Sequence, residues 1–209
     1  GLMPLASASV SKSALDCSRP GKPNVTLQPT ACIDGTTLSF DGVNDYVTTP
    51  LTPNSTFTWI AWINTKSAAA SYQSILAVPN PNYMLMDLYA GAGSFWSYDG
   101  LGGTTLGATG LAAGRWYHLA FVREGNSLIN GYKLYVNGIL TGQANTGIWN
   151  PINNVWIGGR SGVGQYFNGS IDDVRIYNRT LSQAEIYTNY NDGKGSYSNG
   201  PEPGLQLGL

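Results

Sequence analysis

Charged residues are scarce in this 209-residue chain. Asp, Glu, Lys and Arg make up 11% of it, against about 25% in ordinary soluble proteins. The net charge is −1, and the basic residues are scattered along the sequence. The basic patch that binding to a phosphate backbone requires is therefore missing, which argues against nucleic acid as a partner. No apolar run approaches the ~20 residues of a membrane-spanning helix.

Residues that bind metals or carry redox chemistry are also few. The chain has two cysteines, Cys17 and Cys32, and one histidine, His118. Without a Cys-X-X-Cys or Cys/His cluster, neither a zinc site nor a redox centre is expected. A Cys17–Cys32 disulfide would close a loop of ~15 residues and stabilise the fold by about 3 kcal/mol. This disulfide and the low charge predict an extracellular or cell-surface protein. His118 lies in a dense apolar segment, which favours a core or interface histidine over a catalytic base.

Four asparagines match the N-glycosylation pattern Asn-X-Ser/Thr. Chance matches in a chain rich in Asn, Ser and Thr explain them equally well. The four positions are Asn24, Asn54, Asn168 and Asn178.

Glycine and aromatic residues are abundant, with 27 Gly, 13 Tyr and 6 Trp. This composition favours short strands joined by turns over helices. Asn137-Gly138 predicts a tight type I′ turn, and residues 100–110 read as a Gly/Thr-rich loop. Strands are predicted at 37–40, 46–49, 57–63, 74–78, 83–89, 93–98, 116–122, 132–136 and 155–159. Turn signals about every ten residues, without a helical period before residue 180, predict an antiparallel sandwich.

The last predicted strand, near residues 169–179, runs directly into a helix. Ser182 and Glu185 have the spacing of a capping box, and Leu181 and Ile186 are placed for a hydrophobic staple. Strict alternation would put Ile171, Asp173, Arg175 and Tyr177 on one face of the strand, and Asp172, Val174 and Ile176 on the other.

Six segments occur in an order that resembles a LamG-like (laminin G type 3) domain of the concanavalin A-like lectin/glucanase superfamily. They are residues 40–47, 57–63, 116–120, 134–138, 157–160 and 169–179. The resemblance covers about residues 36–193. It implies an all-β fold, an antiparallel two-sheet jelly-roll sandwich with a short C-terminal helix. Residues 1–35 then form an N-terminal extension with the possible disulfide, and residues 194–209 form a tail.

The same superfamily contains β-glucanases, so catalysis has to be considered. Retaining glycosidases need two carboxyl groups about 5–5.5 Å apart, which on one strand means positions i and i+2 or i and i+4. No acidic pair has the first spacing, and the pair with the second, Asp41 and Asp45, spans a Gly-containing turn. A pair assembled from separate strands stays open. We predict that the protein is not an enzyme.

The resemblance also implies a structural calcium ion. In glucanases of the superfamily, an aspartate in the last strand helps to bind calcium, and Asp172 matches its position. Asp41, Asn44 and Asp45 lie in a turn that could supply further oxygen ligands, of which Ca²⁺ takes six to eight. The alternative is that Asp172 and its neighbour Asp173 cap backbone amides or pair with nearby arginines.

Carbohydrate binding requires exposed aromatic rings that stack on sugar rings, with polar groups beside them. The candidates for such a site are Tyr83, Asp87, Tyr89, Trp96, Tyr98, Trp149 and Arg160. Half-buried packing in a sandwich would explain most of these aromatic residues as well.

Both ends of the chain alternate in a way that suits an added strand. Small apolar residues alternate with Ser at 6–11, and Leu recurs at every second position of 205–209. Such segments could pair with the sheet edge of another subunit, or pack on their own domain. We therefore expect a non-catalytic LamG-like subunit of a surface or fibre assembly, self-associating through its ends. The alternative is a monomeric extracellular module that binds glycans or cell-surface proteins, and a glycoside-active enzyme ranks third.

Overall fold

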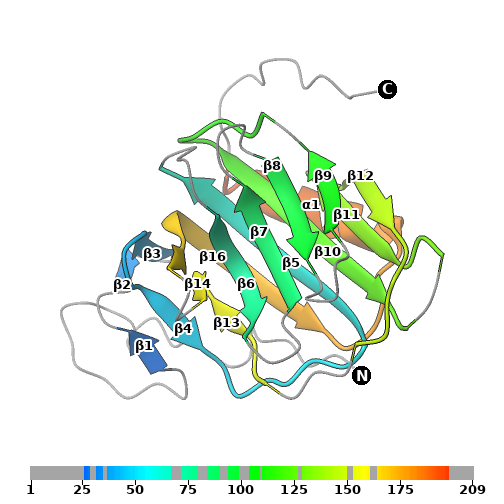
Figure 1. Ribbon diagram of the computed structural model, residues 1–209. Coiled ribbons are helices and arrows are strands. Elements are labelled where there is room, and N and C mark those ends of the chain that lie inside the picture. The colour runs from blue at the N-terminus through cyan, green and yellow to red at the C-terminus, as the bar shows by residue number, and fades with distance from the viewer. Residues whose placement is uncertain are drawn as a thin grey trace.

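The computed structural model describes residues 26–28, 32–34, 37–66, 72–79, 84–89, 94–98, 104–108, 110–126, 129–149, 153–160 and 164–197. Two seven-stranded antiparallel sheets lie face to face in this part of the chain, with one helix outside them (Figure 1). This arrangement confirms the predicted all-β sandwich with a short C-terminal helix.

The sheet that carries the helix is named here the helix-side sheet. Its strand order is β12 (Ile139–Ala144), β11 (Tyr132–Val136), β10 (Trp116–Glu124), β5 (Thr56–Thr65), β16 (Asn168–Tyr177), β3 (Thr37–Asp41) and β2 (Cys32–Asp34). The predicted turn between β11 and β12 is confirmed, because Asn137 and Gly138 both have positive φ angles, of 50° and 79°.

The second sheet is named the front sheet because it faces the viewer in Figure 1. Its order is β1 (Thr26–Gln28), β4 (Tyr46–Thr48), β13 (Trp156–Ile157), β6 (Gln73–Val78), β7 (Met84–Tyr89), β8 (Ser94–Tyr98) and β9 (Thr104–Ala108). A separate pair, β14 (Gly159–Arg160) and β15 (Gln165–Tyr166), follows β13.

Several strands lie where none was predicted, among them β1, β2 and β9. β9 lies within residues 100–110, which were expected to be a loop, and it pairs with β8. Its Thr-Thr-Leu segment favours a strand, but the glycines on either side favour a loop, and the prediction followed the glycines. β1 and β2 come from the predicted N-terminal extension and pair with β4 and β3, one in each sheet.

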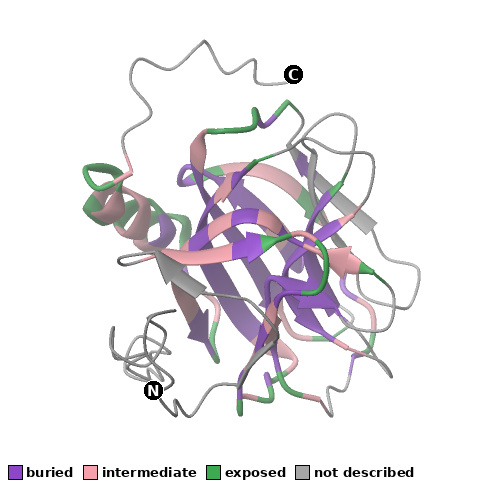
Figure 2. Ribbon diagram, turned by 90° about the vertical axis from the view of Figure 1, so that its left-hand side faces the viewer, coloured by how far each residue is buried: buried purple, intermediate pink, exposed green. Residues whose placement is uncertain are grey.

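The main core fills the space between the two sheets. Phe57, Trp59 and Phe121 come from the helix-side sheet, and Met84 and Met86 come from the front sheet; all five are fully buried. Fully burying one such side chain contributes roughly 1.5–3 kcal/mol. Figure 2 shows these buried strands at the centre of the molecule.

β16 contains a bulge that changes which residues face the core. Its pairing with β5 shifts register between Asp172 and Arg175, and Asp173 has a φ angle of 45°. A bulge adds one residue, so side chains beyond it switch faces. Ile171 and Ile176 therefore both lie in the core, and Val174 packs against it. The strict alternation predicted for this strand is wrong for that reason.

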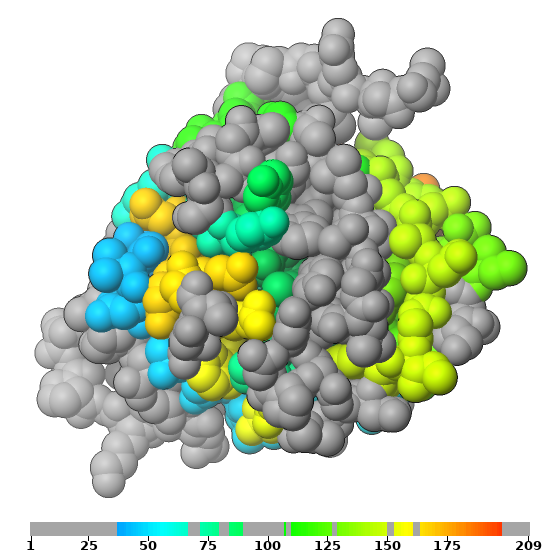
Figure 3. Space-filling view, in the orientation of Figure 1, coloured from blue at the N-terminus to red at the C-terminus, as the bar shows by residue number. Residues whose placement is uncertain are grey.

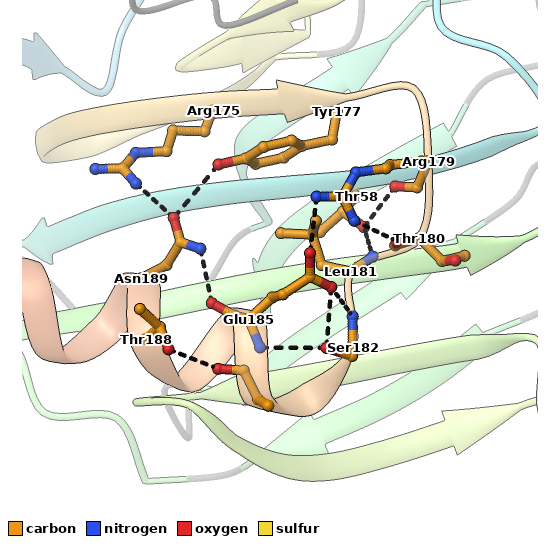
Figure 4. A network of polar contacts seen from close by, with 11 residues as sticks. Thr58, Arg175, Tyr177, Arg179, Thr180, Leu181, Ser182, Glu185, Thr188 and Asn189 are labelled. Atoms are coloured by element: carbon orange, nitrogen blue, oxygen red, sulfur yellow. Dashed lines mark hydrogen bonds and ion pairs between the residues drawn. The ribbon is translucent and has the colours of Figure 1, made fainter. Parts of the chain in front are cut away.

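The helix α1 (Gln183–Lys194) covers the outer face of the helix-side sheet (Figure 2). The predicted capping box is confirmed: the Ser182 hydroxyl accepts from the Glu185 amide at 3.3 Å, and the Glu185 carboxylate accepts from the Ser182 amide at 2.8 Å (Figure 4). Leu181 and Ile186 are buried in a second apolar cluster. In the described part of the chain, no helix is long and apolar enough to cross a membrane.

The end of α1 packs directly on an indole ring. A Cβ atom at Gly193 would lie 2.5 Å from Nε1 of Trp62. The Trp62 ring also stacks on Tyr197, with ring centroids 4.4 Å apart. Glycine at position 193 therefore lets the helix approach the sheet at this point.

We predict that Gly193→Ala destabilises the protein. The added methyl group has to displace Trp62 or the helix, and overpacking of this kind costs about 1–3 kcal/mol, against a gain of at most ~1 kcal/mol in helix propensity. Urea unfolding should show a net loss of about 1–2 kcal/mol. Gly195→Ala is the control, because a Cβ atom there meets nothing within 4 Å. Equal stability of the two variants would contradict the close packing.

A buried histidine lies under the same helix. His118 is 1% exposed, and neither ring nitrogen has a hydrogen-bond partner among the described residues. Burial, followed by the nearby charge of Arg175, lowers the pKa of His118 from 6.5 to about 3. The position agrees with the predicted core histidine.

We predict that His118 makes the protein less stable in acid. Below pH 6.5 the unfolded chain binds a proton that the folded state does not accept until about pH 3, so the folded state loses stability as the pH falls. Between pH 7 and pH 4, the stability difference between His118→Phe and wild type should change by about 3 kcal/mol in favour of the variant. Urea unfolding at both pH values measures it. A difference that does not change with pH would show that His118 is not held neutral.

Candidate functional site

The outer face of the front sheet is the side that α1 leaves uncovered. Along β7, Met84, Met86 and Leu88 point into the core, so Asp87 and Tyr89 belong to the opposite, outer face. Figure 3 views this face. On it, β6 is buried along its whole length and β7 is buried except at Tyr89.

Three half-buried aromatic residues form an aromatic surface on this face: Tyr46, Trp156 and Tyr166. Tyr46 and Trp156 lie parallel, with ring centroids 4.7 Å apart and an interplanar angle of 7°. Tyr166 lies 6.4 Å from Tyr46. Trp156 is next to Tyr46 because β13 pairs with β4.

A glycine makes this arrangement possible. A Cβ atom at Gly159 would lie 2.8 Å from the Tyr166 ring and 2.9 Å from Cβ of Tyr46.

Two further tyrosines extend the aromatic character of the face near the end of β7. Tyr72 and Tyr89 have ring centroids 4.6 Å apart, and Tyr89 is 47% exposed.

An enclosed carboxyl group lies two residues before Tyr89 in β7. Asp87 is 0% exposed, and neither of its oxygens has a hydrogen-bond partner among the described residues. Its register neighbours are Ser74 on β6 and Trp96 on β8. The Ser74 hydroxyl lies beside the carboxyl group without forming a well-aligned hydrogen bond.

The surroundings of Asp87 shift its protonation strongly. Burial raises the pKa of Asp87 from 3.8 to about 7, and the Ser74 hydroxyl and the charge of Arg160 lower it by smaller amounts. Arg160 comes from β14, is 8% exposed, and donates through Nη1 to the side-chain oxygen of Gln165 at 3.2 Å. The face therefore combines partly exposed aromatic residues with a buried carboxyl group and a buried guanidinium.

Some predicted ligand-binding residues lie on this face and others do not. Asp87 and Tyr89 lie there and Arg160 lies beside it, but Asp87 and Arg160 are enclosed. Trp96 and Tyr98 lie in β8, which pairs with β7, and their side chains are outside what the structure describes. Tyr83 also lies outside the described residues.

The prediction that Trp149 lines a ligand-binding site has to be corrected, because the side chain lies in the core. It is 1% exposed and belongs to the core between the sheets. Its ring packs edge-on against Phe57, with centroids 5.7 Å apart, and the Arg123 guanidinium lies over it at 5.4 Å. Its position between turn residues suggested a surface loop, but the loop folds back onto the sandwich.

Tyr46, Trp156 and Tyr166 were missed by the sequence analysis. One signal was available for Trp156, because it alternates with two apolar neighbours, Val155 and Ile157, that lie in the core. Alternation places it on the outer face. No signal in the sequence shows that Tyr166 approaches Tyr46, because that contact depends on the β14–β15 pairing.

The four predicted calcium ligands do not form one site. Asp172 accepts hydrogen bonds from the Thr37 hydroxyl at 3.3 Å and the Tyr197 hydroxyl at 2.8 Å. Thr37 and Asp41 are the two ends of β3, roughly 13 Å apart at the usual rise per residue.

The turn of Asp41, Asn44 and Asp45 is closed by its own hydrogen bonds. Asp41 accepts from the amides of Val43 and Asn44, and Asp45 accepts from the Asp41 amide at 2.9 Å. No group of three acidic, histidine or cysteine side chains suited to a metal occurs among the described residues. The alternative fits better: Asp172 accepts from the Asp173 amide at 2.7 Å, and Asp173 pairs with Arg175. Calcium binding stays a prediction.

The remaining predicted sites stay predictions. Asn54 and Asn178 are exposed, whereas Asn168 is half-buried within β16. Asn24 and Cys17 lie outside the described residues, so neither that glycosylation site nor the disulfide with Cys32 is tested. The terminal segments expected to mediate self-association are also outside them.

The family model described as the concanavalin A-like lectin/glucanases superfamily, laminin G type 3, matches residues 41–187. The chain belongs to this family. The predicted resemblance is thereby confirmed. No curated protein sequence matches the chain.

Solved structures share the LamG-like fold at low sequence identity. Trypanosoma rangeli sialidase in complex with sialic acid matches with a TM-score of 0.65 and 17% identity, over 84% of this chain and 30% of the sialidase. Domain 4 of AbnA, an extracellular GH43 arabinanase from Geobacillus stearothermophilus, in complex with arabinotriose, matches with a TM-score of 0.58 and 17% identity, over 83% of this chain and 84% of that domain. The heptameric SAP-like pentraxin of Limulus polyphemus matches with a TM-score of 0.58 and 13% identity, over 80% of this chain and 82% of the pentraxin. This chain thus spans under a third of the sialidase, and these likenesses establish the fold alone.

We predict that Asp87→Asn stabilises this LamG-like domain at alkaline pH. Folded wild type keeps the Asp87 proton up to about pH 7, whereas the unfolded chain loses it above 3.8, so folded wild type loses relative stability across this interval. The amide cannot ionise. The stability difference between variant and wild type should therefore rise by up to about 4 kcal/mol from pH 4 to pH 8. Thermal or urea unfolding across this range tests it, and a constant difference would be the contrary result.

Proposed function

We propose that this protein is an extracellular, non-catalytic carbohydrate-binding module. Its binding surface is the outer face of the front sheet, centred on Trp156. The observation that carries the proposal is the aromatic surface of Tyr46, Trp156 and Tyr166, three partly exposed residues whose rings lie close together.

Sugar recognition uses rigid aromatic rings that are accessible at the surface. The C–H face of a sugar ring packs on an aromatic face, and polar groups beside it fix the orientation. Trp156 is held in place by its parallel contact with Tyr46, so little side-chain freedom is lost on binding. Gln165 precedes Tyr166 in β15, and its side-chain oxygen accepts from Arg160 Nη1 at 3.2 Å.

A module with the same fold supports the ligand class. Domain 4 of the arabinanase AbnA is in complex with arabinotriose, and the match covers 84% of that domain. We therefore take a short oligosaccharide as the ligand class for this chain.

The acids near this surface support binding over hydrolysis. Asp45 is 2% exposed, and its carboxylate accepts from the Asp41 amide at 2.9 Å. Asp87 is enclosed. Neither offers the exposed carboxyl group that a glycosidase presents to its substrate. The fibre or surface subunit expected from the chain ends rests on terminal segments outside the described residues, and no described contact favours it.

We predict that Trp156→Ala weakens oligosaccharide binding by about tenfold or more, because it removes a stacking platform. A glycan array followed by calorimetry, with arabinotriose as the first oligosaccharide, measures the loss. Tyr187→Ala is the matched control, because Tyr187 is 50% exposed on α1, on the far side of the molecule.

Circular dichroism and melting temperature show whether Trp156→Ala still folds. Tyr166→Ala provides a second variant at the same surface that leaves the Tyr46–Trp156 contact in place. The proposal is wrong if wild type binds no oligosaccharide on the array. It is also wrong if both folded variants bind as wild type does.

A further inference from the structure

The segment after α1 is attached to the helix-side sheet through the side chain of Tyr197. Its ring stacks on Trp62 of β5, with centroids 4.4 Å apart and an interplanar angle of 23°. The ring of Trp116 on β10 lies 4.9 Å away. The Tyr197 hydroxyl donates to the Asp172 carboxylate on β16 at 2.8 Å. Because β10, β5 and β16 are neighbours in the sheet, they form a site for a phenol ring, with two indole walls and one acceptor.

The C-terminal half of α1 has few other contacts that hold it on the sheet. Ile186 is the one residue of the helix that is fully buried, and it lies near the start. Every residue from 187 to 194 is exposed or half-buried. Gly193 and Gly195 disfavour the helical state, and segments that bury little apolar surface open most easily. The attachment of Tyr197, three residues after the helix ends, therefore decides how firmly this half is closed.

The polar atoms beneath the helix end do not bind it. Nε1 of Trp62 and both ring nitrogens of His118 are buried without a hydrogen-bond partner among the described residues. A buried polar group without a partner costs free energy that water restores when the group is exposed. Opening of the helix end is therefore favoured by the groups below it and opposed by Tyr197.

We propose that residues 190–197, here named the strap, open and close over the helix-side sheet as a unit. Their clasp is a phenol-binding site, formed by Trp62, Trp116 and Asp172, that Tyr197 occupies in the closed state. When the strap opens, the site can bind a phenol of the same chemistry from solution. The inference is independent of the carbohydrate function, because the site lies on the sheet opposite the aromatic surface.

The carboxylate gives this site its preference for a phenol over a plain aromatic ring. Burial, followed by the hydrogen bond to Asp172, raises the pKa of Tyr197, so the hydroxyl stays a donor at neutral and mildly alkaline pH. Without Tyr197, Asp172 still accepts from the Thr37 hydroxyl at 3.3 Å and from the Asp173 amide at 2.7 Å. Variants at position 197 therefore leave no unpaired carboxylate in the sheet, and we expect them to fold.

Hydrogen exchange of the full chain in its native state tests the strap. Tyr197→Phe should speed the exchange of the amides at 190–194 about tenfold, because a hydrogen bond to a charged acceptor is lost. Tyr197→Ala should speed it about a hundredfold, because ring stacking is lost as well. The amides of β5 and β10 should stay as protected as in wild type. The control Tyr187→Phe removes the hydroxyl of a tyrosine that is 50% exposed on the same helix, and should change nothing.

Complementation with p-cresol, which is the tyrosine side chain as a free molecule, tests the site. In Tyr197→Ala, p-cresol should shift the indole N–H signals of Trp62 and Trp116 in NMR spectra and slow the exchange at 190–194. Toluene lacks the hydroxyl and should bind about fivefold or more weakly. This preference should disappear when Asp172→Ala is added to Tyr197→Ala. Wild type, whose site is filled, should bind p-cresol about a hundredfold more weakly than Tyr197→Ala does.

Several results would overturn the inference. Equal exchange at 190–194 in wild type and Tyr197→Ala would show that Tyr197 is not the clasp. Equal loss of protection in β5, β10 and the helix end would show that the strap does not open separately. A folded Tyr197→Ala that fails to bind p-cresol, or binds toluene as well, would exclude the phenol site. If Tyr197→Ala does not fold, Tyr197→Phe decides, and exchange equal to that of Tyr187→Phe would contradict the clasp.

Discussion

One extra residue in β16 determines how both faces of the helix-side sheet are used. The bulge at Asp173 brings Ile171 and Ile176 into the core although they are five positions apart. It also turns Arg175 and Tyr177 toward α1, where both meet the side chain of Asn189 (Figure 4). The left-handed backbone at Asp173 is unfavourable for an ordinary residue. A two-pronged ion pair with Arg175, with bonds of 2.8 and 2.7 Å, compensates for it. α1 then packs on this face through Ile186, which is buried with Leu181 and Tyr177.

Three ionisable side chains are buried in this structure, and they differ in their hydrogen-bond partners and in their protonation. Arg123 is 0% exposed, and its guanidinium donates to neutral oxygens. These acceptors are the Ser55 carbonyl, the Tyr132 hydroxyl, the Asn126 side chain and the Gly147 carbonyl. Its donors thereby join the segment before β5, the segment after β10 and the segment after β12. His118 avoids the cost of burial by staying neutral. Asp87 does neither fully, because its pKa lies near 7 and its carboxyl group has no hydrogen-bond donor aimed at it among the described residues. Of the three, Asp87 is the one whose charge can change under ordinary conditions.

The sequence predicted the fold well because the fold depends on local patterns. Alternating aromatic and aliphatic residues, the Asn137-Gly138 turn and the Ser182–Glu185 capping box act over a few residues, and all three appear where expected. The errors arise where a nonlocal contact overrides the pattern. The β16 bulge exchanges the two faces of the strand beyond Asp172. β9 forms by pairing with the edge of β8. Trp149 packs in the core against Phe57 and Arg123. The candidate site was predicted less well for the same reason. Tyr46, Trp156 and Tyr166 come from three separate strands, and only the pairing of those strands brings them together.

Because the identity to the solved structures is low, the function has to be inferred from the surface residues of this chain. A sialidase, an arabinanase domain and a pentraxin share this fold with the chain at 13–17% identity, which is what a packed two-sheet core permits when its outer faces vary. On the front sheet, the inward positions are occupied by Met, Leu and Ile and serve packing alone. The outward positions hold an aromatic surface and a carboxyl group that packing does not require. A leucine or asparagine at position 87 would fill the same space without the cost of burying an ionisable group. Packing alone therefore does not explain the aspartate at position 87, whose carboxyl group is buried without a hydrogen-bond partner among the described residues.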